Sequence, residues 1–189
     1  THFSIIDKFG NAVSITTTIN SSFGSKVVVD GAGFLLNNEM DDFSIKPGFP
    51  NMFGLVGGEA NAIEPNKRML SSMTPTIIEK DNKPFLIVGT PGGSTIITSV
   101  FQTILNVIDF NMGMQEAVDA KRFHHQWLPD ALIIEKNTLE ENVRENLNNL
   151  GHKIIERNSI GRMDCILIKN DGSLEGGADK RGDNIALGY

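Results

Sequence analysis

The sequence has little of several features that would mark common classes of protein. Its 189 residues contain one cysteine, Cys165, so no intrachain disulfide can form, and no Cys and His residues cluster at the spacing of a metal site. No run approaches the ~18–20 apolar residues that a membrane-spanning helix needs. The net charge of −6 and the lack of a basic stripe argue against a nucleic-acid groove. What remains is the composition of an ordinary globular protein.

The order of expected elements indicates the fold class. The chain has no internal repeat, low-complexity tract or linker, so one domain over residues 1–189 is expected. β-branched runs around short turns predict three hairpins: Phe3–Ile6 with Ala12–Ile19, Thr76–Ile78 with Pro84–Val88, and Met163–Ile168 with Ser173–Glu175. Lys26–Val29 is expected to be a short strand, and 31–58 a long functional loop.

Two segments predict helices between these strands. Thr138–Glu141 has the sequence of a capping box, which would open a helix that closes at Gly151. After Gly92–Gly93, apolar residues recur with the helical period on one expected face: Ile96, Ile97, Val100, Phe101, Ile104, Leu105 and Ile108. Together the elements predict an α+β fold, with helices layered on a mainly antiparallel sheet.

The chain starts with Thr1, which has both a hydroxyl and an α-amine, the combination used by N-terminal threonine nucleophiles. A chain that opens on a strand is usually one product of a cleavage, although a boundary that merely exposes a threonine explains the same observation. Antiparallel pairing of the first hairpin would bring Thr18 back toward the chain start, where it could bond the first residue. Ordinary strand threonines are the alternative.

Gly92–Gly93 lies between an expected strand and helix. Paired glycines allow close backbone approach, and the free amides of a helix start suit an oxyanion as well as a phosphate. The Walker lysine and the full dinucleotide fingerprint are missing, so phosphate is the weaker functional interpretation. A plain strand-to-helix turn is the remaining alternative.

Three further polar groups are candidates for binding. Carboxylates and carboxamides at Leu35–Phe43 suit an ammonium, a metal or a catalytic proton, unless the loop is merely solvated; the spacing of a calcium loop is absent. The hydroxyls of Ser71 and Ser72 suit a substrate carboxylate, or simply form a turn. His124 and His125 lack partners at metal spacing, so structural packing is the better interpretation.

Long blocks of the sequence resemble the small subunit of γ-glutamyltranspeptidases, almost from end to end. The blocks are Asp7–Lys8 with Gly10–Val13, Gly33–Phe43, Asn66–Thr76, Pro91–Ser94 and Arg122–Pro129. The resemblance implies the N-terminal-nucleophile hydrolase fold, an αββα sandwich of which this chain supplies the small-subunit half. It also implies a precursor that cleaves itself, with the new N-terminal threonine as nucleophile and the large subunit as obligate partner.

The resemblance assigns roles by position. Thr18 would tune the nucleophile, and the amides of Gly92 and Gly93 would form the oxyanion hole. Residues that would hold the α-ammonium of the γ-glutamyl group are Asn20, Glu39 and Asp42. Ser71 and Ser72 would hold its α-carboxylate, with an arginine of the large subunit. The segment 47–58, which includes Phe53, matches the lid of bacterial members.

Three departures from the family pattern stand out. One residue usually separates the nucleophile from the histidine that matches His2, whereas Thr1 directly precedes it. Either Thr1 is the nucleophile or the residue immediately before it is, and the offset favours the second. Phe53 stands where bacterial lids usually have tyrosine, so a latch through a phenol is lost. Lys121 replaces a usual proline, which we interpret as tolerated.

The sequence therefore predicts an enzyme that cleaves the γ-glutamyl amide of glutathione and related compounds. A γ-glutamyl-threonine ester would pass to water or to an acceptor amino acid or peptide, with no metal or organic cofactor. By family resemblance the protein is expected in the periplasm or outside the cell. A related N-terminal-nucleophile acylase and an inactive binding subunit are the alternatives.

Overall fold

A computed structural model describes residues 1–188. The chain divides into two compact units, which we describe separately. Unit 1 is formed by Thr1–Thr16 together with the chain from Met73 onward, and unit 2 by Thr17–Ser72. That residues 1–189 form a single domain stays a prediction. The model has both helices and largely antiparallel sheets, so the α+β prediction is confirmed.

Unit 1 contains three sheets. An antiparallel hairpin is formed by β1 (His2–Ile6) and β2 (Ala12–Thr16). A four-stranded antiparallel sheet has the order β3 (Thr76–Lys80), β4 (Lys83–Val88), β8 (Asp164–Ile168), β9 (Leu174–Ala178). The third sheet has the order β5 (Phe123–His124), β6 (Leu132–Glu135), β7 (Ile154–Arg157), with β6 and β7 parallel. All three expected hairpins are present.

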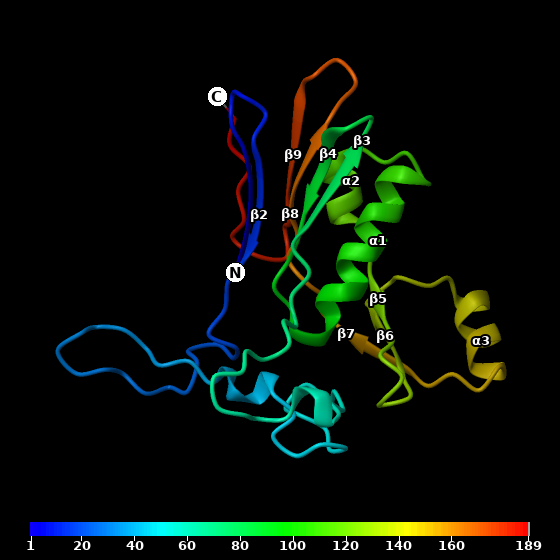
Figure 1. Cartoon of the computed structure of the whole chain (residues 1–189). Helices are drawn as coiled ribbons and strands as arrows, with labels where there is room; N and C mark the ends of the chain where they lie inside the picture. The colour runs from blue at the N-terminus through cyan, green and yellow to red at the C-terminus, as the bar shows by residue number, and fades with distance from the viewer. Residues whose placement is uncertain (189) are drawn as a thin grey trace. The chain divides into compact units, whose positions relative to one another are not determined.

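The four-stranded sheet is covered differently on its two faces (Figure 1). The helices α1 (Ile96–Ile108) and α2 (Met114–Asp119) pack on one face around an apolar core. The β1–β2 hairpin packs on the other. The core side chains are Leu86, Val88, Ile96, Val100, Val107, Met114, Ala117, Val118, Met163, Cys165 and Leu167. Burial in this core raises the pKa of the Cys165 thiol, which is therefore inert rather than nucleophilic.

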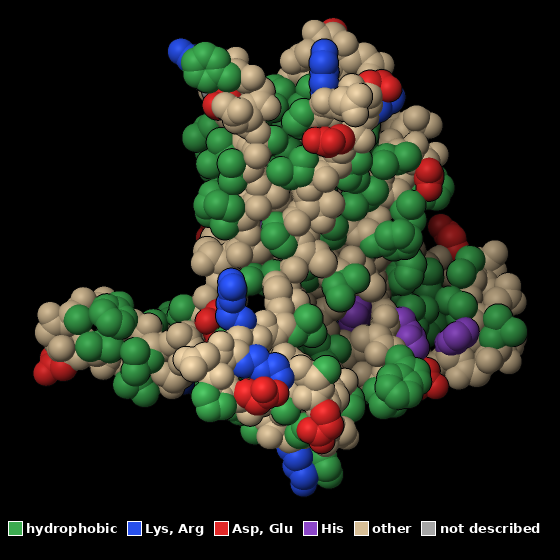
Figure 2. Space-filling model, in the orientation of Figure 1, with side chains coloured by type: hydrophobic (Ala, Val, Ile, Leu, Met, Phe, Trp, Pro, Cys, Tyr) green, Lys and Arg blue, Asp and Glu red, His purple; other side chains and the backbone are tan. Residues whose placement is uncertain are grey.

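Strand alternation gives the hairpin two unlike faces. His2 and Ser4 point toward the four-stranded sheet, where the Ser4 hydroxyl donates to the carbonyl of Asp164 at 2.8 Å. The outward face is apolar and exposed (Figure 2). Its side chains are Phe3, Ile5, Val13 and Ile15. The register pairs Phe3 with Ile15 and Ile5 with Val13, so this face is one continuous apolar ladder.

Two helix predictions need correction. In α1 the apolar residues Ile97 and Phe101 are 62% and 59% exposed, while Ser99 and Thr103 are fully buried. Ile96 and Val100 are buried in the core as predicted, and Ile104 packs against it. The predicted face of the helix is therefore partly correct, and the buried side also includes polar residues. The capping box is also wrong: Thr138 Oγ1 donates to the carbonyl of Glu135 at 2.6 Å, and α3 (Glu141–Asn149) starts without a side-chain cap.

Unit 2 has little regular structure. It contains two 3₁₀ turns, η1 (Glu39–Asp42) and η2 (Glu59–Asn61). The strand expected at Lys26–Val29 is wrong, because Lys26 has a φ of 63° and only Val28 pairs, in an isolated bridge with Leu35. The loop expected over 31–58 is present. Within residues 1–188, no helix has the length and apolar character to cross a membrane.

Candidate active site

The start of the chain is fixed through a buried histidine. His2 is 5% exposed, and its ring contacts Thr16 Oγ1 through Nδ1 at 2.7 Å and Ser4 Oγ through Nε2 at 3.2 Å. A Cβ on Gly89 would lie 2.1 Å from the ring, so only glycine fits beneath it. Burial, helped by the nearby α-amine, lowers the pKa of His2 to about 4. A neutral imidazole therefore ties β1 to β2 through Thr16 and packs over Gly89.

A pocket of about 360 Å³ adjoins the chain start. It is lined by Thr1, Pro91, Arg162, Asp164 and Asn184, among others. Partial burial lowers the pKa of the Thr1 α-amine, Arg162 adds to that effect, and Asp164 opposes it. Burial raises the pKa of Asp164 to about 6.

The Gly92–Gly93 loop has a backbone conformation that favours glycine at both positions. Both residues have positive φ, 151° and 59°, which side chains rarely tolerate. Thr95 Oγ1 donates to the carbonyl of Gly92 at 2.8 Å and holds the loop at the start of η3 (Gly93–Thr95) and α1. Within residues 1–188 the amides of Gly92 and Gly93 have no acceptor. Pro91, which directly precedes these glycines, lines the same pocket as Thr1.

Thr18 lies beyond the paired strand, since the ladder ends at His2 with Thr16. The strand predicted to Ile19 is therefore too long. Thr18 Oγ1 accepts the backbone N–H of Asn20 at 2.8 Å, and Asn20 takes a φ of 71°. This hydroxyl closes a turn, and its role toward the nucleophile stays a prediction.

In unit 2, two of the predicted substrate-binding residues are in direct contact. Ser72 Oγ donates to Asp42 Oδ1 at 2.9 Å, and both line a pocket of about 400 Å³. Asn61 Nδ2 donates to the carbonyl of Asp42 at 2.7 Å and fixes its backbone. A carboxylate beside a hydroxyl offers complementary groups to an ammonium and a carboxylate on one carbon.

The other predicted binding residues make separate contacts within unit 2. Glu39 starts η1, and its N–H donates to Asn37 Oδ1 at 3.0 Å. Asn20 Nδ2 donates to the carbonyl of Asn38 at 3.0 Å, so its amide is already engaged. Ser71 is exposed next to Ser72. The structure thus joins Asp42 with Ser72 directly, and the substrate roles of all five residues stay predictions.

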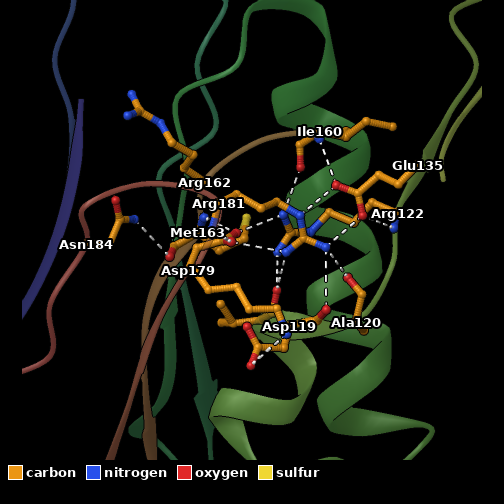
Figure 3. Close-up of polar contacts among 12 residues, drawn as sticks. Asp119, Ala120, Arg122, Glu135, Ile160, Arg162, Met163, Asp179, Arg181 and Asn184 are labelled. Atoms are coloured by element: carbon orange, nitrogen blue, oxygen red, sulfur yellow. Dashed lines mark hydrogen bonds and ion pairs between the residues drawn. The ribbon is translucent and has the colours of Figure 1, made fainter. Parts of the chain in front are cut away.

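Sequence reasoning missed a buried ion-pair cluster in unit 1 (Figure 3). Arg122 Nη1 donates to Asp179 Oδ2 at 2.9 Å, and Arg181 forms ion pairs with Glu135 at 2.6 Å and Asp179 at 3.0 Å. Burial alone would raise the pKa of Asp179, but the cations of Arg122 and Arg181 and the N–H groups of Met163 and Arg181 together lower it. Asp179 Oδ2 also accepts the N–H of Met163 at 2.9 Å. The cluster therefore fixes the turn that leads into β8 and Asp164.

The packing prediction for His124 is confirmed. This side chain is 2% exposed, and its ring nitrogens contact Thr98 Oγ1 and Gln126 Oε1, both at 2.8 Å. For His125 the packing prediction is wrong, because this side chain is exposed and contacts Asp130 Oδ1 at 3.2 Å on the surface. Among residues 1–188, no three His, Cys, Asp or Glu side chains gather in a geometry suited to a metal ion.

Comparison with known proteins gives consistent results. The glutathione hydrolase proenzyme of Escherichia coli (strain K12) is 50% identical over 190 residues, which cover 100% of this chain and 33% of the relative. The chain therefore spans about a third of the length of its curated relatives. A solved Helicobacter pylori gamma-glutamyltranspeptidase T380A mutant is 58% identical with a TM-score of 0.92, covering 96% of this chain and 100% of that chain.

A second solved structure and a family model complete the comparison. Gamma-glutamyltranspeptidase from Pseudomonas nitroreducens complexed with L-DON is 49% identical with a TM-score of 0.94, covering 100% of this chain and 99% of that chain. These likenesses confirm the N-terminal-nucleophile hydrolase fold. The family model described as Gamma-glutamyltranspeptidase matches residues 1–189. This chain belongs to the gamma-glutamyltranspeptidase family.

Proposed function

We propose that this chain is the nucleophile-bearing subunit of a γ-glutamyl transferase and hydrolase that acts on glutathione and related γ-glutamyl compounds. The observation that carries the proposal is the chain start, which shares a pocket with the loop whose Gly92 and Gly93 amides have no acceptor within residues 1–188. Amides free to bind a developing oxyanion beside a terminal hydroxyl and amine suit acyl transfer.

The reaction would proceed through an ester. The hydroxyl of Thr1, or of the residue immediately before it, attacks the γ-carbonyl carbon, and the terminal α-amine accepts the hydroxyl proton. The Gly92 and Gly93 amides stabilise the tetrahedral oxyanion, and the proton then leaves with the departing amine. Water or an acceptor amine attacks the resulting γ-glutamyl ester and releases the nucleophile. Asp42 and Ser72 would hold the α-ammonium and α-carboxylate of the donor.

The proposed enzyme includes a second polypeptide, the large subunit. The solved Helicobacter pylori chain is covered entirely by this chain, whereas the curated relatives, named proenzymes, are about three times longer. This agrees with a precursor that is cut to yield a separate small subunit. The exposed apolar ladder of the β1–β2 hairpin suits burial against the remaining large subunit. A periplasmic or extracellular location stays a prediction.

Donor selectivity tests the function. We expect the two-subunit protein to hydrolyse a γ-glutamyl anilide and to ignore an anilide of a simple fatty acid, because Asp42 and Ser72 recognise an amino-acid head. Cleavage of the acyl anilide alone would favour the acylase alternative. Cleavage of neither, with correctly assembled protein, would favour an inactive binding subunit.

A further inference from the structure

The lid segment, which we define as residues 47–58, is a compact hairpin within unit 2. Gly48 N donates to the carbonyl of Gly57 at 2.8 Å, and Asn51 N donates to the carbonyl of Leu55 at 2.8 Å. The Asn51 carboxamide closes the tip, since its Oδ1 accepts the N–H groups of Phe53 and Leu55, both at 3.0 Å. Because these bonds lie inside the hairpin, the segment would move as one body about its two ends.

Asp41, which lies outside the hairpin, ties its tip to the rest of unit 2. Asp41 Oδ2 accepts the backbone N–H of Met52 at 3.2 Å. The carbonyl of the same residue accepts Asn51 Nδ2 at 3.5 Å. Weaker contacts reach Met52 Sδ from Asn20 Nδ2 at 3.7 Å and from Asn38 Nδ2 at 4.0 Å. A thioether is a weak acceptor, so the charged carboxylate ties the tip more strongly than these two contacts do.

Asp41 also lies beside the predicted substrate-binding pair. The pocket of about 400 Å³ is lined by Asp41, Asp42 and Ser72, and also by lid residues that include Phe49, Pro50 and Val56. Asp41 and Asp42 are consecutive in η1. One carboxylate of this turn therefore faces the lid while the next bonds Ser72.

We propose that Asp41 is a positioning residue that latches the lid segment over the pocket containing Asp42 and Ser72, through its carboxylate on the Met52 N–H. Phe53 has no hydroxyl and cannot form such a latch through its side chain. The latch itself is a property of unit 2, whereas its effect on donor binding rests on the proposed function. When Asp41 binds the Met52 N–H, the donor head group dissociates slowly from the pocket. When this bond is lost, the donor dissociates more readily, while the rate of the chemical step is unchanged.

Two variants of the assembled two-subunit protein test the latch. Asp41→Ala removes the acceptor, whereas Asp41→Asn keeps a neutral oxygen that still accepts the Met52 N–H. The matched control is Asp30→Ala, which removes an exposed carboxylate of unit 2 that has no hydrogen bond among the described residues. Hydrogen exchange of the Met52 amide reports the latch without any substrate, and steady-state kinetics with a γ-glutamyl anilide report its consequence.

We expect Met52 exchange to accelerate about 10-fold in Asp41→Ala, less in Asp41→Asn, and not at all in the control, as for loss of one hydrogen bond to a charged group. KM should rise in the same order, with kcat nearly constant.

If Asp41→Ala fails to assemble, Asp41→Asn alone must still show faster exchange. Unchanged Met52 exchange in the variants overturns the latch. Equal KM increases in both variants with unchanged exchange would show instead that Asp41 binds a substrate cation. Faster exchange in a protein inactive on every donor would support the latch and count against the proposed function.

Discussion

The two units are stabilised by different means. Unit 1 buries an apolar core between a four-stranded sheet and two helices, and its charged side chains are paired in a buried cluster. In unit 2 the one large hydrophobic side chain that is buried is Phe43. This unit is held by backbone hydrogen bonds and by bonds from Asn, Asp and Ser side chains to backbone groups. Unit 1 holds the chain start and the free amides, and unit 2 holds the predicted head-group residues. Substitutions in the core and the ion-pair cluster of unit 1 should therefore mainly affect stability, and those at the predicted head-group residues of unit 2 should mainly affect binding.

The largest expected effect is on binding in unit 2. Asp42→Ala should leave the donor ammonium unpaired and cost about 3–5 kcal/mol in kcat/KM. The unfolding midpoint should change little, because Asp42 is not part of an apolar core. Kinetics with a γ-glutamyl anilide measure the loss, with Asp30→Ala as the control. An unchanged kcat/KM would remove Asp42 from the site.

A glycine in unit 1 should give the largest effect on stability. Gly89→Ala places a methyl group 2.1 Å from the His2 ring, and overpacking of this kind costs about 3 kcal/mol. Gly58→Ala in unit 2 meets nothing within 4 Å and should be close to neutral. Urea unfolding of both variants compares the units with the same chemical change. Equal urea unfolding midpoints for the two variants would contradict the expected difference between the units.

The carboxyl of Asp164 should make stability depend on pH. Its pKa is raised to about 6, mainly by burial, above the usual value near ~4, so the folded state disfavours its charge. Stability from this group is therefore present below pH ~4 and is lost as the pH rises to about 6. Asp164→Asn should stabilise the protein by about 1–1.5 kcal/mol above pH 7, after a discount for solvent screening, and not at pH 4. A stabilisation that is equal at both pH values would contradict the assignment.

The smallest effect concerns the lid. Phe53→Tyr adds a hydroxyl to the lid segment and should tighten donor binding by about 1 kcal/mol, the value of one net hydrogen bond. The substitution should slow amide exchange across residues 47–58. If neither KM nor exchange changes, a phenol gives no latch in this chain.

The sequence predicted unit 1 better than unit 2. Local signals were sufficient for the three hairpins, because turn residues and β-branched runs act over a few residues: Asp81 and Asn82, for example, take the positive φ values of a tight turn. The buried face of α1 was only partly predictable, since Ile97 and Ser99 differ in burial through tertiary packing rather than period.

For the functional site, too, local patterns were predictable and contacts between distant residues were not. Composition and motifs identified Asp42, Ser72 and the Gly92–Gly93 loop, and the resemblance assigned their roles. The ion pairs of Arg122 and Asp179 join residues 57 positions apart, so no local pattern could predict them. Asp41 was missed because its importance lies in one bond to the backbone of Met52.

The most direct test of the proposed nucleophile is to find which residue an electrophilic glutamine analogue modifies. The assembled protein would be treated with L-DON, and the adduct located by peptide mass spectrometry. The proposed mechanism predicts a covalent adduct on the terminal residue of the small subunit, which is either Thr1 or the residue immediately before it. An adduct on any other side chain, or no adduct on a protein that is correctly assembled, would contradict it.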